Sequence, residues 1–311
     1  MKTSTIISPA FFLPFCAVIF SCLSNAAAGT GAASERRLSD YMPPLKNSAY
    51  NTEVYILDSG VPGMNVLVIG GTHGGERAGI IAAGLLVRHA LPKRGCMFVI
   101  PRLNKSSGRL VSEPARGGNG EELYFPPGSV RALPGYEGRN INRAYPGSAE
   151  IDAGPAQKIA FAVMNILTTE GIDLAIDLHE TGISSKLAWH IIANPKNAAV
   201  AASAVLDLEE KNIPMNMDVS PEEMRGLSHK EWGDRTGAGA FLIETSEQAP
   251  LWKRTAVHLE TIASLIACTG AAKGKLFVYG GVPDYAEMER DNREGGALLS
   301  GALSFLPEEN K

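Results

Sequence analysis

Apolar runs of four or five residues alternate with longer amphipathic stretches from Asn51 onward. The short runs are rich in Val, Ile and Leu, which is typical of strands that are covered on both faces. They predict strands at residues 54–57, 65–69, 97–100, 174–178, 189–192, 240–243 and 275–279. The longer stretches predict helices at residues 77–91, 155–169, 198–211 and 251–269. This alternation predicts an α/β fold in which helices cover both faces of a twisted sheet that is mostly parallel or mixed.

The first 28 residues have the layout of a secretory signal peptide. Lys2 is the only charged residue before Glu35, residues 11–23 are almost entirely apolar, and small residues follow. An apolar run of this length, interrupted by Pro14, is too short to cross the roughly 30 Å of a bilayer core. We therefore expect cleavage near Ala28, export to the periplasm or the extracellular space, and no stable membrane insertion after cleavage.

The mature chain is predicted to form one catalytic domain. Residues 29–50 are small and polar and include two prolines, so they predict a linker and the loop that leads into the domain. No repeat or further linker divides residues 51–311. Within them, residues 104–145 are rich in Gly, Pro and Arg and show little periodicity. A loop of this length inside a compact domain is often functional.

Charge and cysteine content narrow the range of functions. The formal net charge of -4 and the pI of about 5.9 argue against a general nucleic-acid-binding protein, which needs a basic surface. Cys96 and Cys268 remain after cleavage of the signal peptide. Export permits a disulfide between them, but two separately buried thiols fit the sequence as well.

Three predicted strands end in residues that bind metal ions or transfer protons. His73 and Glu76 follow one strand, His179 stands at the end of a second, and Glu244 at the end of a third. Because ligands of open parallel sheets bind beyond the carboxyl ends of the strands, these side chains are expected to meet. Two histidines and one carboxylate suit Zn²⁺ and leave a fourth position for water, as in catalytic zinc sites. A single histidine is more often a hydrogen-bonded structural residue, so the prediction depends on the whole set.

A second group of polar residues lies in the segment GRNINRAYPG, residues 138–147. Asn142 and Arg143 precede a turn at Tyr145-Pro146-Gly147. An arginine beside a metal site can bind a carboxylate through two parallel hydrogen bonds. Taken alone, Arg143 is more readily explained as a surface residue of a loop.

Four motifs occur in the order GGTHGGE, NINRAYPG, AIDLHE and FLIET. In this order they resemble the zinc carboxypeptidase superfamily, and GGTHGGERAG is most similar to its succinylglutamate desuccinylase/aspartoacylase branch. The resemblance implies one Zn²⁺ per chain, with His73, Glu76 and His179 as its ligands. It further implies that Asn142 and Arg143 hold a free carboxylate of the substrate. Glu244 corresponds to the glutamate that acts first as general base and then as general acid.

The sequence departs from the family pattern at two places. The family has a further arginine before the Asn-Arg pair, which polarises the scissile carbonyl. Arg131 and Arg139 both lie near that position, and we favour Arg131. The stretch after Glu244 holds one predicted helix, one predicted strand and an acidic tail, so we expect it to lack the additional β-domain of the aspartoacylase branch.

These features predict an exported zinc-dependent hydrolase of the deacylase type. It would cleave an amide next to a free carboxylate by zinc-bound water, on an N-acyl amino acid or a peptide. A zinc metallocarboxypeptidase acting on peptides, including cell-wall peptides, is the alternative, and a non-enzymatic binding protein is a third interpretation. Asp177 is a candidate hydrogen-bond partner for the ligand His179, and His229 and Trp232 are weak candidates for lining the pocket.

Overall fold

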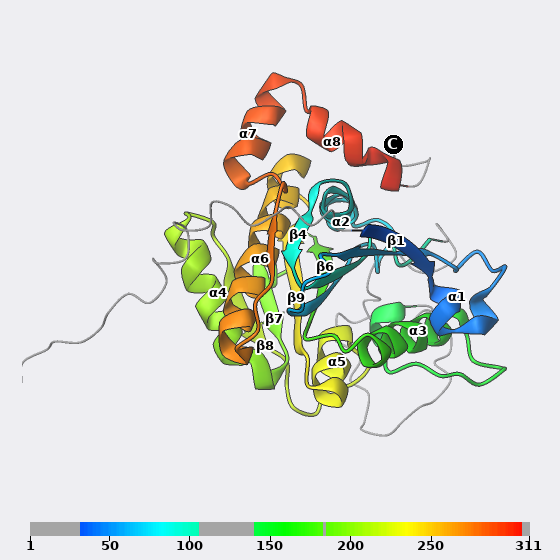
Figure 1. Cartoon of the computed structure of the whole chain (residues 1–311). Helices are drawn as coiled ribbons and strands as arrows, with labels where there is room; N and C mark the ends of the chain where they lie inside the picture. Colours follow the sequence, from blue (N-terminus) through cyan, green and yellow to red (C-terminus); the bar gives the residue numbers. More distant parts are fainter. Residues whose placement is uncertain (1–31, 106–139, 183–184, 307–311) are drawn as a thin grey trace, which may run out of the picture.

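An eight-stranded mixed sheet forms the centre of the molecule (Figure 1). The structure is a computed structural model that describes residues 32–105, 140–182 and 185–306. The strands follow the spatial order β1 (Ala32–Arg37), β2 (Glu53–Asp58), β5 (Cys96–Ile100), β3 (Asn65–Ile69), β6 (Leu174–Thr181), β9 (Gly239–Ser246), β7 (His190–Ala193) and β8 (Asn216–Val219). The α/β fold predicted from the sequence is therefore confirmed.

The middle of the sheet is parallel and its flanks are partly antiparallel. Strand β3 pairs in parallel with β5 and β6, and β6 pairs in parallel with β9. Strands β2 and β7 join this parallel core through antiparallel ladders with β5 and β9. Strands β3 and β5 consist almost wholly of buried apolar residues, because helices cover both faces of the sheet.

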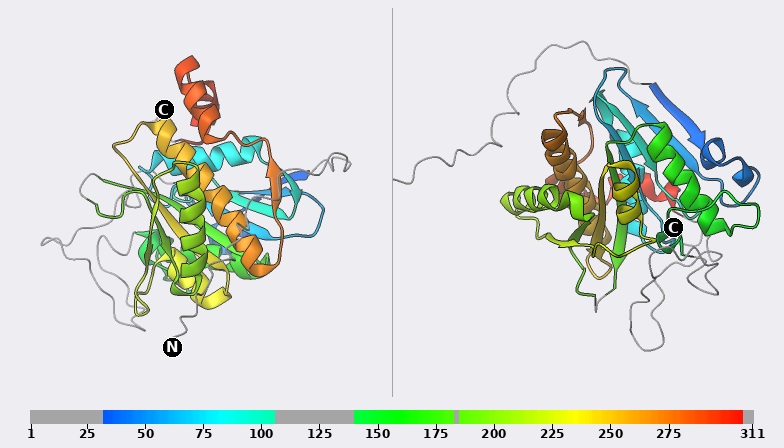
Figure 2. Two further views of the ribbon diagram at one scale, coloured as in Figure 1. Left: turned by 90° about the vertical axis from the view of Figure 1, so that its left-hand side faces the viewer. Right: turned by 90° about the horizontal axis from the view of Figure 1, so that it is seen from below.

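Two layers of helices enclose the sheet, as the views in Figure 2 show. One face, which we call the α2 face, carries α2 (Arg77–His89), α4 (Ala198–Glu210) and α6 (Leu251–Lys273). The other, the α3 face, carries α1 (Leu38–Tyr41), α3 (Pro155–Thr169) and α5 (Ser228–Thr236). Along β3, Val66 and Val68 point to the first core, whereas Leu67 and Ile69 point to the second. The alternation of side chains along each strand thus decides which face a residue reaches.

Smaller elements complete the molecule. Strands β4 (Leu91–Arg94) and β10 (Val278–Gly280) form a separate two-stranded sheet. Helices α7 (Tyr285–Glu294) and α8 (Ala297–Ala302) stand beyond the two layers, at the top of Figure 1. The short helices η1 (Pro43–Leu45), η3 (Ile141–Arg143), η4 (Pro195–Asn197) and η5 (Leu303–Phe305) make connections. Phe305 packs against Gly84 of α2, where any larger residue would clash.

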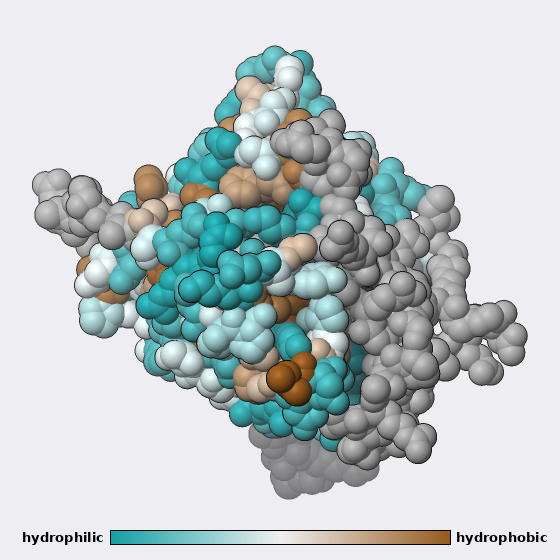
Figure 3. Space-filling model, turned by 90° about the vertical axis from the view of Figure 1, so that its right-hand side faces the viewer, coloured by the Kyte–Doolittle hydropathy of each residue, from teal (hydrophilic) through white to brown (hydrophobic). Residues whose placement is uncertain are grey.

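Residues 29–50 differ from the predicted linker, because β1, α1 and η1 lie within them. The side chains described in β1 are exposed and, apart from Ala33, polar, so no apolar pattern marks it. Instead, a six-residue antiparallel ladder with β2 holds it at the edge of the sheet. Leu38 and Leu45 then bury their side chains in the α3-face core. Seen from the side of β1, α1 and α3, the surface is mostly hydrophilic with small separate hydrophobic areas (Figure 3).

Cys96 and Cys268 are both free thiols. Cys96 packs at the α3-face core and Cys268 at the α2-face core, so the sheet separates them. Of the two arrangements that the sequence left open, the structure therefore shows two separate thiols.

Helix α6 is the one helix among the described residues that is long and apolar enough to span a membrane. However, 67% of its apolar window is buried inside the molecule, as in a core helix. The expected signal peptide, residues 106–139 of the long loop, Arg131 and Arg139 all lie outside the described residues.

Candidate active site

Three predicted ligands converge on one point beyond the carboxyl ends of the central strands. His73 and Glu76 lie in the turn between β3 and α2, and His179 lies near the end of β6. The two Nδ1 atoms of His73 and His179 are 3.2 Å apart. Glu76 Oε1 lies 2.7 Å from His73 Nδ1, and Glu76 Oε2 lies 3.1 Å from His179 Nδ1. One donor atom from each residue fits within 4.8 Å of the others, so the group could hold a metal ion.

These donor distances fit a tetrahedral zinc ion. Zinc binds imidazole nitrogen and carboxylate oxygen at about 2.0–2.2 Å, which places tetrahedral ligand atoms about 3.3 Å apart. The separations of 3.2 Å between the two Nδ1 atoms and 3.1 Å between His179 Nδ1 and Glu76 Oε2 lie close to that value, whereas the 2.7 Å between His73 Nδ1 and Glu76 Oε1 is shorter. Glu76 Oε2 is also buried, and among the described residues its close polar contact is His179 Nδ1, the other predicted ligand atom. The donor set is therefore suited to zinc in both chemistry and spacing.

Glycines bring the turn after β3 close to its neighbours. Gly71 has a φ of +63°, in the left-handed region that side chains rarely adopt. A Cβ atom at Gly70 would lie only 2.5 Å from the carbonyl oxygen of Gly79 in α2. The chain can therefore leave β3 and enter α2 tightly enough for His73 and Glu76 to face the same point.

The far nitrogen of each histidine ring is also engaged. His73 Nε2 lies 3.1 Å from Asn140 Oδ1, and His179 Nε2 lies 3.0 Å from Asp177 Oδ2. Thr72 donates its hydroxyl to Asp177 Oδ1 at 2.7 Å. Such partners fix the orientation of metal-binding imidazoles, so both Nδ1 atoms are held toward the centre. Asp177 lies where the sequence predicted, and Asn140 is a partner that the sequence analysis missed.

The electrostatics of the group favour ionised carboxylates. Burial alone would raise the pKa of Glu76, but the nearby charges of His73 and His179 hold it below its usual value. Burial likewise acts against the charge of His179, but Asp177 and Glu76 raise its pKa well above the ordinary value. Two carboxylates therefore surround the rings with negative charge, which attracts a cation.

Glu244 lies beside His179 in the sheet. The two residues are register partners in the parallel ladder between β6 and β9, so their side chains leave the sheet on the same, α3, face. Glu244 Oε2 is buried without a hydrogen bond within the described part of the chain. Burial, with further contributions from neighbouring carboxylates, raises the pKa of Glu244 to about 8. A carboxylate with this affinity for protons can take and return a proton near neutral pH.

Glu180 points to the opposite face. Sequence analysis assigned it no role, but its carboxylate is buried and accepts the backbone N–H of Ala78 at 2.8 Å. Its other oxygen lies 2.6 Å from Arg254 Nη1 of α6. The ion pair therefore joins the end of β6 to α6, and the hydrogen bond with Ala78 joins it to the first turn of α2, directly after the ligand Glu76.

Asn142 and Arg143 lie in η3, close to the candidate metal ligands. Asn140 connects this segment to His73, as described above. Asn142 Oδ1 accepts the backbone N–H of Ser228 at 2.8 Å, and Arg143 Nη1 donates to the carbonyl oxygen of Asn142 at 2.8 Å. The Arg143 side chain is half-buried. The structure thus brings the predicted Asn-Arg pair next to the predicted metal ligands.

Two further histidines lie near the site. His190 of β7 is the register partner of Glu244 on its other side, and its Nδ1 lies 2.9 Å from the carbonyl oxygen of Ala188. His229 is buried in α5 with its Nε2 2.5 Å from Ser220 Oγ, and burial lowers its pKa to about 3. Trp232 is buried in the same helix against Tyr145. His229 and Trp232 therefore lie buried in α5, a helix that the sequence analysis did not predict.

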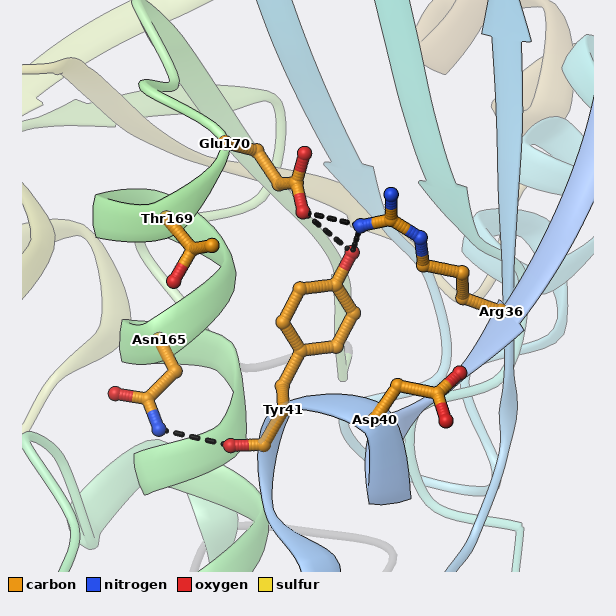
Figure 4. Close-up of a pocket in the computed structure, with 6 residues that line it drawn as sticks. All are labelled: Arg36, Asp40, Tyr41, Asn165, Thr169 and Glu170. Atoms are coloured by element: carbon orange, nitrogen blue, oxygen red, sulfur yellow. Dashed lines mark hydrogen bonds and ion pairs between the residues drawn. The ribbon is translucent and has the colours of Figure 1, made fainter.

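A surface hollow of about 360 Å³ lies at the other end of the sheet (Figure 4). Tyr41 and Arg36 point toward Glu170 there, with Tyr41 Oη donating to Glu170 Oε1 at 2.9 Å. Asn65, the first residue of β3, binds the backbone oxygen of Glu170. The hollow is therefore at the amino ends of the parallel strands, away from His73 and His179.

Comparison with known proteins agrees with this geometry. Residues 119–267 match the model of the succinylglutamate desuccinylase/aspartoacylase catalytic domain. That range includes Asn142, Arg143, His179 and Glu244, whereas His73 and Glu76 precede it. No curated protein matches the sequence.

Three solved structures illustrate the similarity in fold. An aspartoacylase family protein from Mesorhizobium loti is 18% identical with a TM-score of 0.52, covering 79% of this chain and 69% of that one. A metallo-carboxypeptidase from Burkholderia cenocepacia is 13% identical with a TM-score of 0.53, covering 77% and 65%. Product-bound cell shape determinant protein Csd4 from Helicobacter pylori is 16% identical with a TM-score of 0.52, covering 76% and 56%. The chain thus spans less than two thirds of the last two proteins.

Proposed function

We propose that this chain, whose residues 119–267 match the succinylglutamate desuccinylase/aspartoacylase catalytic domain and whose fold is similar to zinc carboxypeptidase-like proteins, is an exported zinc-dependent amide hydrolase. It would cleave an amide bond next to a free carboxylate, in an N-acyl amino acid. The observation that carries the proposal is the convergence of His73, Glu76 and His179 beside Glu244. Hydrolysis of this kind is what members of the superfamily perform.

His73, Glu76 and His179 would hold the zinc ion. When bound, zinc supplies Lewis-acid polarisation of a carbonyl oxygen and lowers the pKa of water toward about 7. Asn140 and Asp177 would keep the two imidazole rings in place through their far nitrogens. This arrangement leaves the ligand atoms little freedom to reorganise when the ion binds.

Glu244 would move the protons of the reaction. Its buried Oε2 would take a proton from the attacking water and later return it to the nitrogen of the leaving amine. Its raised pKa, about 8, supports both steps, because the protonated form is accessible near neutral pH. Arg131 would polarise the scissile carbonyl, as the resemblance implies.

Asn142 and Arg143 would bind the free carboxylate of the substrate. A guanidinium holds a carboxylate through charge-assisted hydrogen bonds, which fixes the amide relative to the reacting groups. The link from Asn140 to His73 places this pair beside the candidate metal ligands. A substrate anchored there would extend its amide toward Glu244.

A substrate panel on the zinc-loaded protein tests the proposal. N-succinyl-L-glutamate and N-acetyl-L-aspartate are compared with dipeptides and cell-wall tripeptides, and His179→Ala serves as the matched inactive control. The proposal expects release of succinate or acetate, with carboxamide analogues of the same substrates reacting about ten- to a hundred-fold more slowly. Release of an amino acid from peptides alone would make the protein a metallocarboxypeptidase instead. No hydrolysis of either class would favour a binding protein.

A further inference from the structure

The segment that carries Asn142 is held by a loop 86 residues away. Tyr145 donates its backbone N–H to the carbonyl oxygen of Gly226 at 3.2 Å, and Ser228 donates its backbone N–H to Asn142 Oδ1 at 2.8 Å. Gly226 has a φ of +85°, and a Cβ atom there would lie 2.8 Å from the backbone oxygen of Arg143. Residues 226–228 therefore lie tightly against the proposed carboxylate-binding segment.

The Ser228 contact fixes which way the Asn142 side chain points. A backbone N–H can only donate, so the Asn142 atom that faces it is the carbonyl oxygen and not the amide nitrogen. Asn142 Nδ2 donates to no partner among the residues that the structure describes. The side chain is buried, so its amide is confined to this orientation and presents its N–H₂ group away from Ser228.

The same segment is tied to the candidate metal ligands at its other end. Asn140 Oδ1 accepts the backbone N–H of Asn142 at 2.9 Å and lies 3.1 Å from His73 Nε2. Hydrogen bonds therefore run from His73 through Asn140 and Asn142 to Ser228. Asn142 is fixed relative to both the ligand group and α5.

We infer that the backbone N–H of Ser228 is a positioning group that determines substrate specificity. By accepting this hydrogen bond, Asn142 is locked as a donor, so the position beside Arg143 accepts a carboxylate and disfavours a carboxamide. A freely rotating Asn142 could turn its oxygen toward the N–H₂ of a carboxamide and would lose this discrimination. The inference rests on the proposed function, because it assumes that Asn142 and Arg143 face the substrate's carboxylate.

Ser228→Pro removes the N–H without removing the helix. Ser228 is the first residue of α5, where proline is well tolerated because its missing N–H has no partner inside the helix. Leu227 has φ −84° and ψ 144°, which is the extended conformation that a following proline requires. The substitution therefore deletes the hydrogen bond to Asn142 while keeping the backbone path.

The measurement is kcat/KM for an N-acyl amino acid that the wild type hydrolyses and for its carboxamide. In Ser228→Pro the value for the free acid is expected to fall about five- to tenfold, whereas that for the carboxamide stays within about twofold. Ser228→Ala keeps the N–H that binds Asn142 and removes only the hydroxyl, which interacts with Asp177, so it should keep the acid-to-amide ratio whatever its effect on the overall rate. A lost ratio in Ser228→Ala, or an unchanged ratio in Ser228→Pro, overturns the inference.

Asn142→Asp provides a second test that does not depend on how Ser228→Pro folds. One aspartate oxygen can still accept the Ser228 N–H, but the other presents an acceptor and a negative charge to the substrate. The free acid should lose about a hundredfold in kcat/KM and the carboxamide much less, with the melting temperature of the metal-free protein near that of wild type. Equal losses on both substrates would contradict the inference. A wild type that treats acid and carboxamide alike would instead refute the carboxylate-directed part of the proposed function.

Discussion

Glu244 is the residue on which the proposed chemistry depends most directly. It stands beside His179 in the β6–β9 ladder, and its Oε2 is buried without a hydrogen bond among the described residues. A buried oxygen in this state costs free energy unless it serves a ligand or a reaction. Its place in the fold therefore supports a role in moving protons rather than in stabilising the sheet.

We expect Glu244→Gln to abolish most turnover while leaving metal binding intact. The substitution keeps the shape of the side chain but removes its ability to take a proton. General acid–base catalysis contributes about 10²–10⁴-fold, so kcat should fall by that factor at unchanged zinc content. The check is kcat together with zinc per chain by elemental analysis. A variant within threefold of wild-type kcat would remove Glu244 from the mechanism.

The metal ligands give a second prediction at this scale. His73→Ala and His179→Ala each remove one of three donor atoms, so both purified proteins should contain far less than the one zinc per chain expected of wild type. Zinc affinity is measured by competition with a chelator. His190→Ala is the matched control, since His190 lies on the same face but outside the ligand group. Full zinc in both ligand variants would contradict the assignment.

Single residues could be predicted from the sequence where a short stretch of the chain contains the pattern that identifies them. His73 and Glu76 stand three residues apart in one motif, and His179 and Glu244 end apolar runs, so a pattern could identify them. Asn140 and Ser228 act through contacts with residues 67 and 86 positions away, and no local pattern reports such contacts. A hydrogen-bond partner is therefore visible only in the fold.

At the level of elements, Glu180 connects β6 to two helices, and its buried ion pair with Arg254 joins β6 to α6. Glu180 also accepts the N–H of Ala78, one of the helix-terminal donors that would otherwise lack a partner. Since α2 starts directly after Glu76, the position of that ligand depends on the position of the helix. The Glu180 carboxylate thus stabilises the start of α2 next to Glu76, and Arg254 supplies its counter-charge.

Arg254→Met should destabilise the metal-free protein by about 3 kcal/mol, because it leaves the buried Glu180 carboxylate without its counter-charge. The free energy of unfolding is measured by urea titration. The double variant Arg254→Met/Glu180→Gln is the control, and it should recover part of the loss because it no longer buries an unpaired charge. Equal stability of Arg254→Met and wild type would show that the pair contributes nothing.

Elements with an apolar pattern were predicted well, and those without one were missed. Helix α3 has the bounds that its periodicity predicted, and β3 spans the predicted residues. Strand β1 is held by backbone pairing with β2 and by polar contacts such as the ion pair of Arg36 with Glu170, and α5 consists mainly of polar residues that nevertheless lie buried beside the site. In both cases the tertiary structure supplies the stabilisation, so hydrophobic periodicity carries no signal.

Across the whole molecule, the sequence predicted the α/β class but not the strand order. The sheet joins strands that are far apart in the chain, such as β3 with β6, and adds antiparallel strands on both flanks. Which strand lies beside which depends on the packing of the two helical layers. The sequence nevertheless predicted that the motifs meet at one edge of the sheet. This prediction needed only parallel pairing, which brings the carboxyl ends of β3, β6 and β9 together.

The two helical layers also contain buried neutral histidines, which make global stability depend on pH. His229 in the α3-face layer and His258 of α6 in the α2-face layer are both buried, and burial lowers the pKa of each to about 3. An unfolded histidine has a pKa of about 6.5. Above that pH both states are neutral, so these residues add no pH dependence there. Between pH 6.5 and 3 the unfolded chain binds protons that the folded chain does not, so stability falls as the pH falls.

We expect each of these histidines to cost about 2 kcal/mol of stability at pH 5 relative to pH 7. His258→Gln tests this, because glutamine can keep a hydrogen bond to Thr245 but does not titrate. Urea unfolding of the metal-free wild type and variant at pH 7 and pH 5 gives four free energies. The difference in free energy of unfolding between wild type and variant at pH 7 measures the packing effect of the substitution. Protonation of the metal ligands at pH 5 affects both proteins alike, so it cancels in the comparison. The wild type should therefore lose about 2 kcal/mol more than His258→Gln between the two pH values, and equal losses would mean that His258 is not held neutral by the fold.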